Sequence, residues 1–301
     1  MTIAGFYLTP EGVVLGADST MSSPTASGMH YFNFTQKILQ IGEGGTLGLM
    51  VWGLASVSPS VSYRTLVAKL DDSLKQKKPK TVLEVAQRWV DFVWPLYDSF
   101  SLVARFKALK AKPPHNAADP ASRTQDEEVE FKNLCDGLVL GFCIAGYIPG
   151  DRTPIACSMQ FSPDGGKPSP TEHKVESFSW WGMPNIVKRL IFGADDNLKR
   201  AVVKSPHWKG TDADFDGLLA EQRLMHGSLP IRDAVDYVHS CIYSTIKAMK
   251  FSSFLQVCGG PIEVAVITTD RKFRWVRHKS WEAAILDGES HARPSSDPRY
   301  V

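Results

Sequence analysis

Four short apolar runs in the first 55 residues constrain the fold of this chain more than any other feature. Residues 3–8 and 13–18 flank a tight turn, and residues 36–41 and 46–55 flank a glycine-rich loop. Within each run the apolar residues are nearly consecutive instead of alternating with polar ones, which is typical of strands that are covered on both faces. We therefore expect sheets that have a further layer packed against each side.

Helical periodicity replaces this pattern further along the chain. Leucines recur at intervals of four residues between positions 66 and 74, which predicts a helix with one buried stripe. Thr81 and Glu84 have the spacing of a capping box, so a second helix is expected to begin there and to kink or end at Pro95.

The remaining segments complete an alternation of strand groups and helix groups. The expected elements are strands at 138–147, 153–161 and 173–181, helices at about 184–202 and from Pro230, and a final strand pair within 258–276. Strands in hairpin groups, with helices in separate blocks, indicate an α+β fold in which antiparallel sheets are sandwiched between helical layers.

We expect a single domain over residues 1–286, which carries an insertion and is followed by a tail. The segment 107–133 is rich in proline, alanine and charge and poor in large apolar residues, so it is interpreted as a surface insertion or mobile loop. Residues 287–301 are polar and contain proline, which is typical of a terminal tail.

Composition and charge exclude several classes of function. Apolar residues make up 43% and charged residues 22% of the chain and the net charge is +2, so neither nucleic acid nor an anionic membrane is an expected partner. The N-terminus does not have the pattern of a signal peptide, and no run of about 18 apolar residues occurs, so a cytoplasmic protein without a membrane span is expected. The scattered cysteines and unpaired histidines predict free thiols, no metal and no cofactor.

Five stretches of the sequence resemble, in order, those of a known family. They are TIAGFYLTPEGVVLGADST at 2–20, TQKILQIGEGGTLGLMVWGLA at 35–55, LVLGFCIAGY at 138–147, PIACSMQFSPDGG at 154–166 and CGGPIEVAVITTDRKFRWV at 258–276. On these motifs the chain resembles the proteasome β-subunit family of N-terminal nucleophile (Ntn) hydrolases, which includes the bacterial proteasome-like ring peptidases. The resemblance implies a four-layer α-β-β-α sandwich and a homo-oligomeric ring whose active sites face a closed chamber.

The chemistry of that family depends on a free N-terminal threonine. A threonine hydroxyl is a poor nucleophile until a base removes its proton. A free α-amine titrates near about 7.7–8.0, so it can accept that proton at cellular pH. In the family a lysine and an aspartate hold the amine and the hydroxyl in place, and a backbone N–H stabilises the oxyanion.

On this resemblance Thr2 is the nucleophile once Met1 has been removed, and threonine is a second residue of the small kind that methionine aminopeptidases accept. Asp18 lies 16 residues after Thr2, which matches the family's interval from nucleophile to aspartate. Gly53 occupies the loop that offers the oxyanion N–H. Asn33 stands where the family has its catalytic lysine, and asparagine can form hydrogen bonds but supplies no positive charge.

Other polar positions of the family are replaced in this chain. The family's supporting serine falls at Trp181, and its supporting aspartate and a further serine fall near Leu255 and Cys258. Apolar or neutral side chains at these positions are consistent with core packing in a subunit that has lost its activity.

The register of the N-terminal strand also has an alternative. Matching Ile3 to a family N-terminus of the form Thr-Thr-Ile-Ala-Gly places Met1 at the nucleophile position. A slip of one residue turns every side chain of a strand to the opposite face, so the two registers are not equivalent. The register with Thr2 as the nucleophile is preferred.

Three functions remain open from the sequence. The preferred one is a threonine-type endopeptidase that acts on polypeptides inside a ring, with an ATP-dependent unfoldase as partner if its substrates are folded. The second is a catalytically degenerate ring subunit with a structural or regulatory role. The third is hydrolysis or transfer of a small amide by the same fold, in a pocket lined by Trp52, Trp180 and Trp181, although aromatic residues in apolar strands more often belong to the core.

Overall fold

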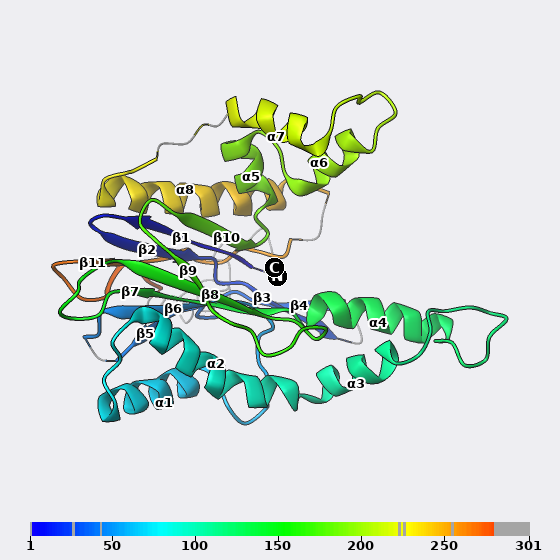
Figure 1. Cartoon of the computed structure of the whole chain (residues 1–301), viewed down its shortest axis with the longest axis horizontal. Helices are drawn as coiled ribbons and strands as arrows, with labels where there is room; N and C mark the ends of the chain where they lie inside the picture. The colour runs from blue at the N-terminus through cyan, green and yellow to red at the C-terminus, as the bar shows by residue number, and fades with distance from the viewer. Residues whose placement is uncertain are drawn as a thin grey trace, which may run out of the picture.

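The computed structural model describes residues 2–25, 28–42, 44–221, 224, 227–253 and 256–279. It has a mixed α/β structure in which antiparallel sheets lie between groups of helices (Figure 1). Three positions discussed above, Met1, Leu255 and the expected tail at 287–301, lie outside the described residues. Within the described residues, no helix combines the length and the apolar character that crossing a membrane requires.

Sheet I contains both ends of the described chain. Its strand order is β10-β1-β2-β11-β12, and every neighbouring pair is antiparallel. The strands are β1 (Ile3–Thr9), β2 (Gly12–Ala17), β10 (Phe178–Gly182), β11 (Glu263–Thr268) and β12 (Arg274–Arg277). All residues of β1 and β2 are buried, which confirms the expectation of strands covered on both faces.

Sheet II is formed by the middle of the chain and is also antiparallel. Its order is β5-β6-β7-β8-β9, and a separate two-stranded hairpin precedes it in the sequence. The strands of sheet II are β5 (Ile38–Ile41), β6 (Leu47–Gly53), β7 (Leu140–Gly146), β8 (Ile155–Phe161) and β9 (Thr171–His173), and the hairpin consists of β3 (Met21–Thr25) and β4 (Gly28–Phe32).

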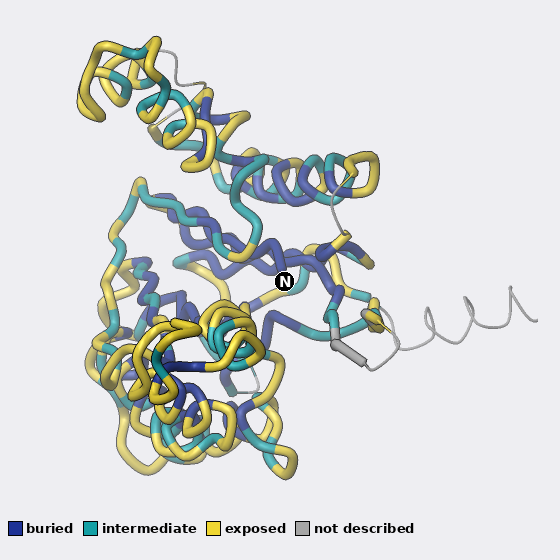
Figure 2. The backbone as a smooth tube through the Cα atoms, turned by 90° about the vertical axis from the view of Figure 1, so that its right-hand side faces the viewer, coloured by how far each residue is buried: buried dark blue, intermediate teal, exposed yellow. Residues whose placement is uncertain are grey.

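The helices occupy the outer sides of the two sheets (Figure 1). Those near sheet II are α1 (Tyr63–Gln76), α2 (Val82–Asp98), α3 (Ser101–Lys110) and α4 (Gln125–Gly137). Those near sheet I are α5 (Asn185–Phe192), α6 (Asp196–Val203), α7 (Asp212–Glu221) and α8 (Ile231–Lys250). Figure 2 shows that the buried backbone is concentrated in the strands and on the helices that touch them.

Three apolar clusters hold these elements together. The central cluster fills the space between the sheets, where Phe6 and Leu15 of sheet I meet Ile38 and Met50 of sheet II. A second cluster joins sheet I to α5 and α8, and a third joins sheet II to α1, α2 and α3. Each large side chain that is fully buried in these clusters contributes about 1.5–3 kcal/mol relative to an exposed one.

The second helix differs in two details from the sequence prediction. The Thr81 hydroxyl accepts a hydrogen bond from the Glu84 N–H at 3.1 Å, but the Glu84 carboxylate accepts from Lys80 N–H at 2.9 Å and not from Thr81. The helix also continues through Pro95 to Asp98. Proline removes one backbone donor and crowds the carbonyl four residues earlier. The buried face of α2, which includes Val93 and Tyr97 on either side of Pro95, compensates for this cost.

Two further segments were divided differently from the prediction. The expected strand at 173–181 is split between β9 in sheet II and β10 in sheet I, so the chain crosses between sheets at this point. The helix expected at 184–202 is interrupted at Gly193, whose φ of +81° ends α5 before α6 begins. A left-handed glycine is a common way for a helix to end.

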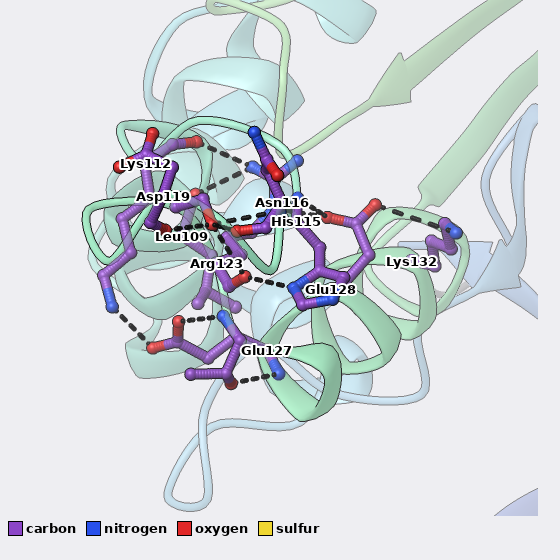
Figure 3. Close-up of polar contacts among 11 residues, drawn as sticks. Leu109, Lys112, His115, Asn116, Asp119, Arg123, Glu127, Glu128 and Lys132 are labelled. Atoms are coloured by element: carbon purple, nitrogen blue, oxygen red, sulfur yellow. Dashed lines mark hydrogen bonds and ion pairs between the residues drawn. The ribbon is translucent and has the colours of Figure 1, made fainter.

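Residues 107–133, which were interpreted as a surface insertion or mobile loop, are partly helical. Residues 107–110 end α3 and residues 125–133 belong to α4, and the two helices pack against one another as a helical arm beside sheet II (Figure 1). Arg123 closes this arm: its guanidinium donates to the carbonyls of Leu109 and Lys112 at 3.0 Å, and to the Glu128 carboxylate at 2.7 Å (Figure 3). Composition could not reveal this arrangement, because it depends on specific contacts: the hydrogen bonds of one buried arginine and the stacking of Phe106 on Phe131 with ring centroids 5.0 Å apart.

We expect Arg123→Ala to destabilise the chain by about 2–3 kcal/mol. The variant leaves the carbonyls of Leu109 and Lys112, at the C-terminal end of α3, without their charged donor. The matched control is Arg105→Ala in the same arm, whose side chain is 42% exposed against 6% for Arg123 and whose ion pairs with Glu127 and Glu130 are surface contacts. That control is expected to cost less than about 1 kcal/mol. Urea unfolding of both variants measures the difference, and equal losses would contradict the assigned role of Arg123.

Candidate active site

Asp18 is the centre of the candidate site. It directly follows β2, and it is fully buried. Its Oδ1 accepts hydrogen bonds from Ile3 N–H at 3.1 Å and from the Lys37 ammonium at 2.6 Å. Its Oδ2 accepts from Thr20 N–H at 3.2 Å and from Gly259 N–H at 2.9 Å. Both carboxylate oxygens therefore have partners, which is the condition for burying such a group.

Lys37 provides the positive charge of the site. It directly precedes β5, it is buried, and its Nζ also donates to the Thr20 carbonyl at 2.6 Å. Burial lowers the pKa of the Lys37 ammonium, and the contact with Asp18 opposes that shift. A buried ammonium beside a carboxylate can serve as a fixed source of positive potential for a neighbouring reactive group.

Asn33 does not occupy this position. Asn33 is an exposed residue, and its side-chain oxygen accepts a hydrogen bond from the Thr20 hydroxyl at 3.0 Å. The contact with Asp18 is made by Lys37. The alignment of Lys37 and Ile38 with the family's strand placed the lysine position at Asn33, four residues before the lysine that contacts Asp18. The signal that could have found it is a single lysine directly before the apolar strand 38–41.

Thr2 lies next to this ion pair. It is only 4% exposed, and its carbonyl accepts from Met183 N–H at 2.7 Å, which fixes it against the end of β10. The following amide, Ile3 N–H, shares the Oδ1 atom of Asp18 with the Lys37 ammonium. The structure therefore brings together Thr2, Asp18 and a lysine, as the resemblance implied, but the lysine is not at position 33.

A stacked tryptophan pair connects the Thr2 side of the site to Gly53. Trp181 of β10 stacks on Trp52 of β6 with ring centroids 4.2 Å apart and planes 9° apart. Gly53 follows Trp52 at the end of β6 and has a φ of +85°; a Cβ atom there would lie 2.1 Å from the Val139 carbonyl oxygen. Only glycine fits this turn, so residue 53 has no side chain that could cover its own backbone N–H.

At two positions where the resemblance implied polar side chains, this chain has Trp181 and Cys258. Trp181 is engaged in the stack, and Cys258 is fully buried. Burial raises the pKa of the Cys258 thiol to about 12, with the Asp18 charge adding to the shift and Lys37 opposing it. The thiol is therefore neutral at physiological pH. The segment at 258–260 contributes to the site through the Gly259 amide instead of through a side-chain hydroxyl.

The tryptophans that could have lined a small-molecule pocket are part of the apolar clusters. Trp52 belongs to the cluster between the sheets, and Trp181 packs against it. Trp180 faces the opposite side of β10, where its ring lies over Gly5 in the cluster beneath α8. In the part of the chain that the structure describes, no three histidine, cysteine or acidic residues are grouped so that they could hold a metal ion.

Comparison with known proteins gives likenesses among solved structures alone. No family model matches the chain, and no curated protein matches it. Among solved structures the chain is similar to the Gly-1 mutant of Anbu from Hyphomicrobium sp. strain MC1, with 12% sequence identity and a TM-score of 0.49, over 99% of this chain and 100% of that one. The function of this chain therefore has to be argued from its own geometry.

Proposed function

We propose that this chain is a threonine-type Ntn hydrolase that cleaves peptide bonds with Thr2 after Met1 has been removed. The observation that carries the proposal is the buried Lys37–Asp18 pair, which lies one residue from Thr2 and is completed by three backbone amides. Two antiparallel sheets with a shared core and helices outside them also support a four-layer sandwich and a single domain over residues 1–286.

The proposed reaction begins with the free amine of Thr2. In its neutral form the amine takes the proton of the Thr2 hydroxyl, whose oxygen attacks the carbonyl carbon of the substrate. The positive charge of Lys37 lowers the pKa of the nearby amine, so a larger fraction of it is neutral at pH 7. The Gly53 N–H stabilises the oxyanion, and the amine returns the proton to the leaving nitrogen. Water then hydrolyses the ester on Thr2.

The other polar residues have supporting roles in this proposal. Asp18 fixes the position of Lys37 and is held in turn by Ile3, Thr20 and Gly259. Asn33 does not replace the lysine; it binds the hydroxyl of Thr20, the residue whose carbonyl accepts from the lysine. The same geometry favours the register with Thr2, since the amide after Thr2 shares an oxygen with Lys37.

The test is covalent labelling of Thr2 in protein purified without an N-terminal tag. We expect an intact mass that lacks Met1, and a single adduct with an electrophile that reacts with a hydroxyl and its adjacent amine together. Peptide mapping is expected to place the adduct on Thr2. Retention of Met1, or a Met-free chain that forms no adduct, would contradict the proposal.

The alternative is a subunit of the same fold without catalytic activity. Trp181 and Cys258, which are neutral where the family is polar, favour it. In that case Lys37 and Asp18 are only a structural ion pair, and Thr2→Ala has no effect on any hydrolysis that the sample shows. The labelling experiment separates these two functions directly.

We further propose that the chain forms a homo-oligomeric ring that takes in polypeptides, with an ATP-dependent unfoldase as partner for folded substrates. This part of the proposal is supported by the motif resemblance alone. Light scattering on size-exclusion fractions at micromolar concentration measures the assembly, and a purely monomeric protein would contradict it.

A further inference from the structure

A second buried ion pair lies beside the candidate site. Glu263, the first residue of β11, is fully buried and pairs in register with Ala17, the residue before Asp18. Its Oε2 is 3.0 Å from the Nζ of Lys279, whose side chain is only 9% exposed. Its Oε1 is 2.7 Å from Nδ1 of His278. A buried ion pair contributes little net stability because both charges lose their hydration, so its presence calls for another reason.

Lys279 also joins the two backbone segments that carry Asp18 and Lys37. Its ammonium donates to the Ser19 hydroxyl at 3.0 Å and to the Thr35 carbonyl at 2.9 Å. Thr35 N–H in turn donates to the Ser19 carbonyl at 3.0 Å, and Ser19 N–H donates to the Gly259 carbonyl at 3.0 Å. Ser19 follows Asp18, and Thr35 lies two residues before Lys37. Lys279 therefore fastens these segments where their charged side chains meet.

The two ion pairs also act on each other electrostatically. The negative charge of Glu263 raises the pKa of Lys37, against the lowering that burial causes. Burial lowers the pKa of Lys279, and the positive charge of Lys37 adds to that lowering while Glu263 and Asp18 oppose it. Two cations and two carboxylates thus share one buried region, and each carboxylate stabilises the charge of both lysines.

We propose that Glu263 and Lys279 form a positioning pair, which holds the backbone on both sides of the candidate site and balances the charge at Lys37. Neither side chain is required to touch substrate. The inference rests on the proposed function for its catalytic consequence, but the hydrogen bonds from Lys279 can be tested without any activity.

The pH dependence of the Glu263–Lys279 pair also depends on the other charged and titratable groups nearby. The groups that interact electrostatically with Lys37 are Asp18, Cys258, Glu263 and Lys279. His278 faces Glu263 and stacks on Trp275, and on the neighbouring helix His239 contacts Arg277 at 2.9 Å. A His278→Gln variant, which leaves Glu263 and Lys279 in place, measures the imidazole contribution separately.

The experiment compares Glu263→Gln, Lys279→Met and the double variant with the wild-type protein. In Glu263→Gln a negative charge is lost, so the pKa of the Thr2 amine falls and the acidic limb of kcat/KM moves to lower pH. In Lys279→Met a positive charge is lost, so the limb moves to higher pH. Each shift is expected to be about half a pH unit. A role in folding alone does not produce shifts of opposite sign.

The double variant separates positioning from stability. Removing both buried charges is expected to restore the melting temperature that either single change lowers, because no unpaired charge remains. It is not expected to restore kcat, which should stay about ten- to hundredfold low because Ser19 and Thr35 have lost their common donor. Recovery of kcat together with the melting temperature would overturn the proposal. The control is Lys272→Met, an exposed lysine of the same terminal hairpin.

Hydrogen exchange provides the measurement that does not depend on activity. In Lys279→Met, amides of the peptides that cover residues 18–20 and 33–37 are expected to exchange at least about tenfold faster, while those of α2 are unchanged. Unchanged exchange in those peptides would overturn the positioning role even in an active enzyme. If Lys279→Met exchanges faster in those peptides but the wild-type chain hydrolyses nothing, the positioning pair is supported and only the proposed activity is rejected.

Discussion

Replacing Thr2 with alanine is expected to reduce the hydrolysis of unstructured peptides at least about 10³-fold, the largest effect of any single change. The variant keeps the backbone carbonyl that accepts from Met183, so the end of β1 should stay in place. The free amine also remains, but it has no hydroxyl to deprotonate. Initial rates with a fluorogenic peptide library, measured on Met-free protein, test this expectation.

Thr2→Ser is the matched control for that variant. It keeps both a hydroxyl and an α-amine, so a measurable rate is expected, together with the same covalent adduct as in the wild-type protein. If Thr2→Ala and the wild-type protein hydrolyse peptides equally, the activity comes from another site or another protein. In that case the alternative of a catalytically degenerate subunit is preferred.

Lys37→Met is expected to lower kcat/KM about 10²–10³-fold at pH 7, which is a typical effect of removing one electrostatic group from a site. Two causes act together: the base loses its positive neighbour, and Asp18 loses the ammonium that contacts its Oδ1 at 2.6 Å. Without that charge the pKa of the amine rises, so the neutral fraction at pH 7 falls. The deficit should therefore shrink as the pH is raised from 7 to 9, and a pH–rate profile measures it.

Stability has to be controlled in this experiment. Removing one partner of a buried ion pair costs about 3–5 kcal/mol, so Lys37→Met alone could lose activity by unfolding. The double variant Lys37→Met with Asp18→Asn removes both charges and should regain most of the stability without regaining activity. Lys78→Met, at an exposed lysine, should change neither quantity. A Lys37→Met protein that is folded and fully active would rule out the proposed role of the lysine.

The parts of the fold that sequence patterns predicted are those controlled by local burial. The apolar runs at 3–8 and 46–55 predicted fully covered strands because both faces of each strand had to be apolar. Asp18 was found for a different reason: its interval of 16 residues from Thr2 matches the interval in the family that the motifs resemble. Arg123 and the helical arm were missed because they depend on a few specific contacts, the hydrogen bonds of Arg123 and the stacking of Phe106 on Phe131, which composition does not record.

Lys37 was missed for a different physical reason. The partner of a buried carboxylate is determined by distance in space, while an alignment to a family's strand counts positions along the chain. Lys37 is 19 residues from Asp18 in the sequence, and only the fold shows that its ammonium lies 2.6 Å from the carboxylate. The crossing of the chain from β9 (Thr-Glu-His) to β10 (Phe-Ser-Trp-Trp-Gly) was missed because the two strands follow each other closely in the sequence and were interpreted as one.

The four hydrogen bonds to Asp18 have a consequence for the order in which the protein becomes competent. Their donors are Ile3, Thr20, Lys37 and Gly259, so the carboxylate joins the first residues of the described chain to a residue 241 positions later than itself. A nascent chain that has not reached Gly259 has β1 and β2 but lacks one of the two donors to Oδ2 of Asp18, as well as β11, the strand that pairs with β2. The candidate nucleophile is thus synthesised long before the last of the groups that hold Asp18, and the site can form only after Gly259 and β11 have been made.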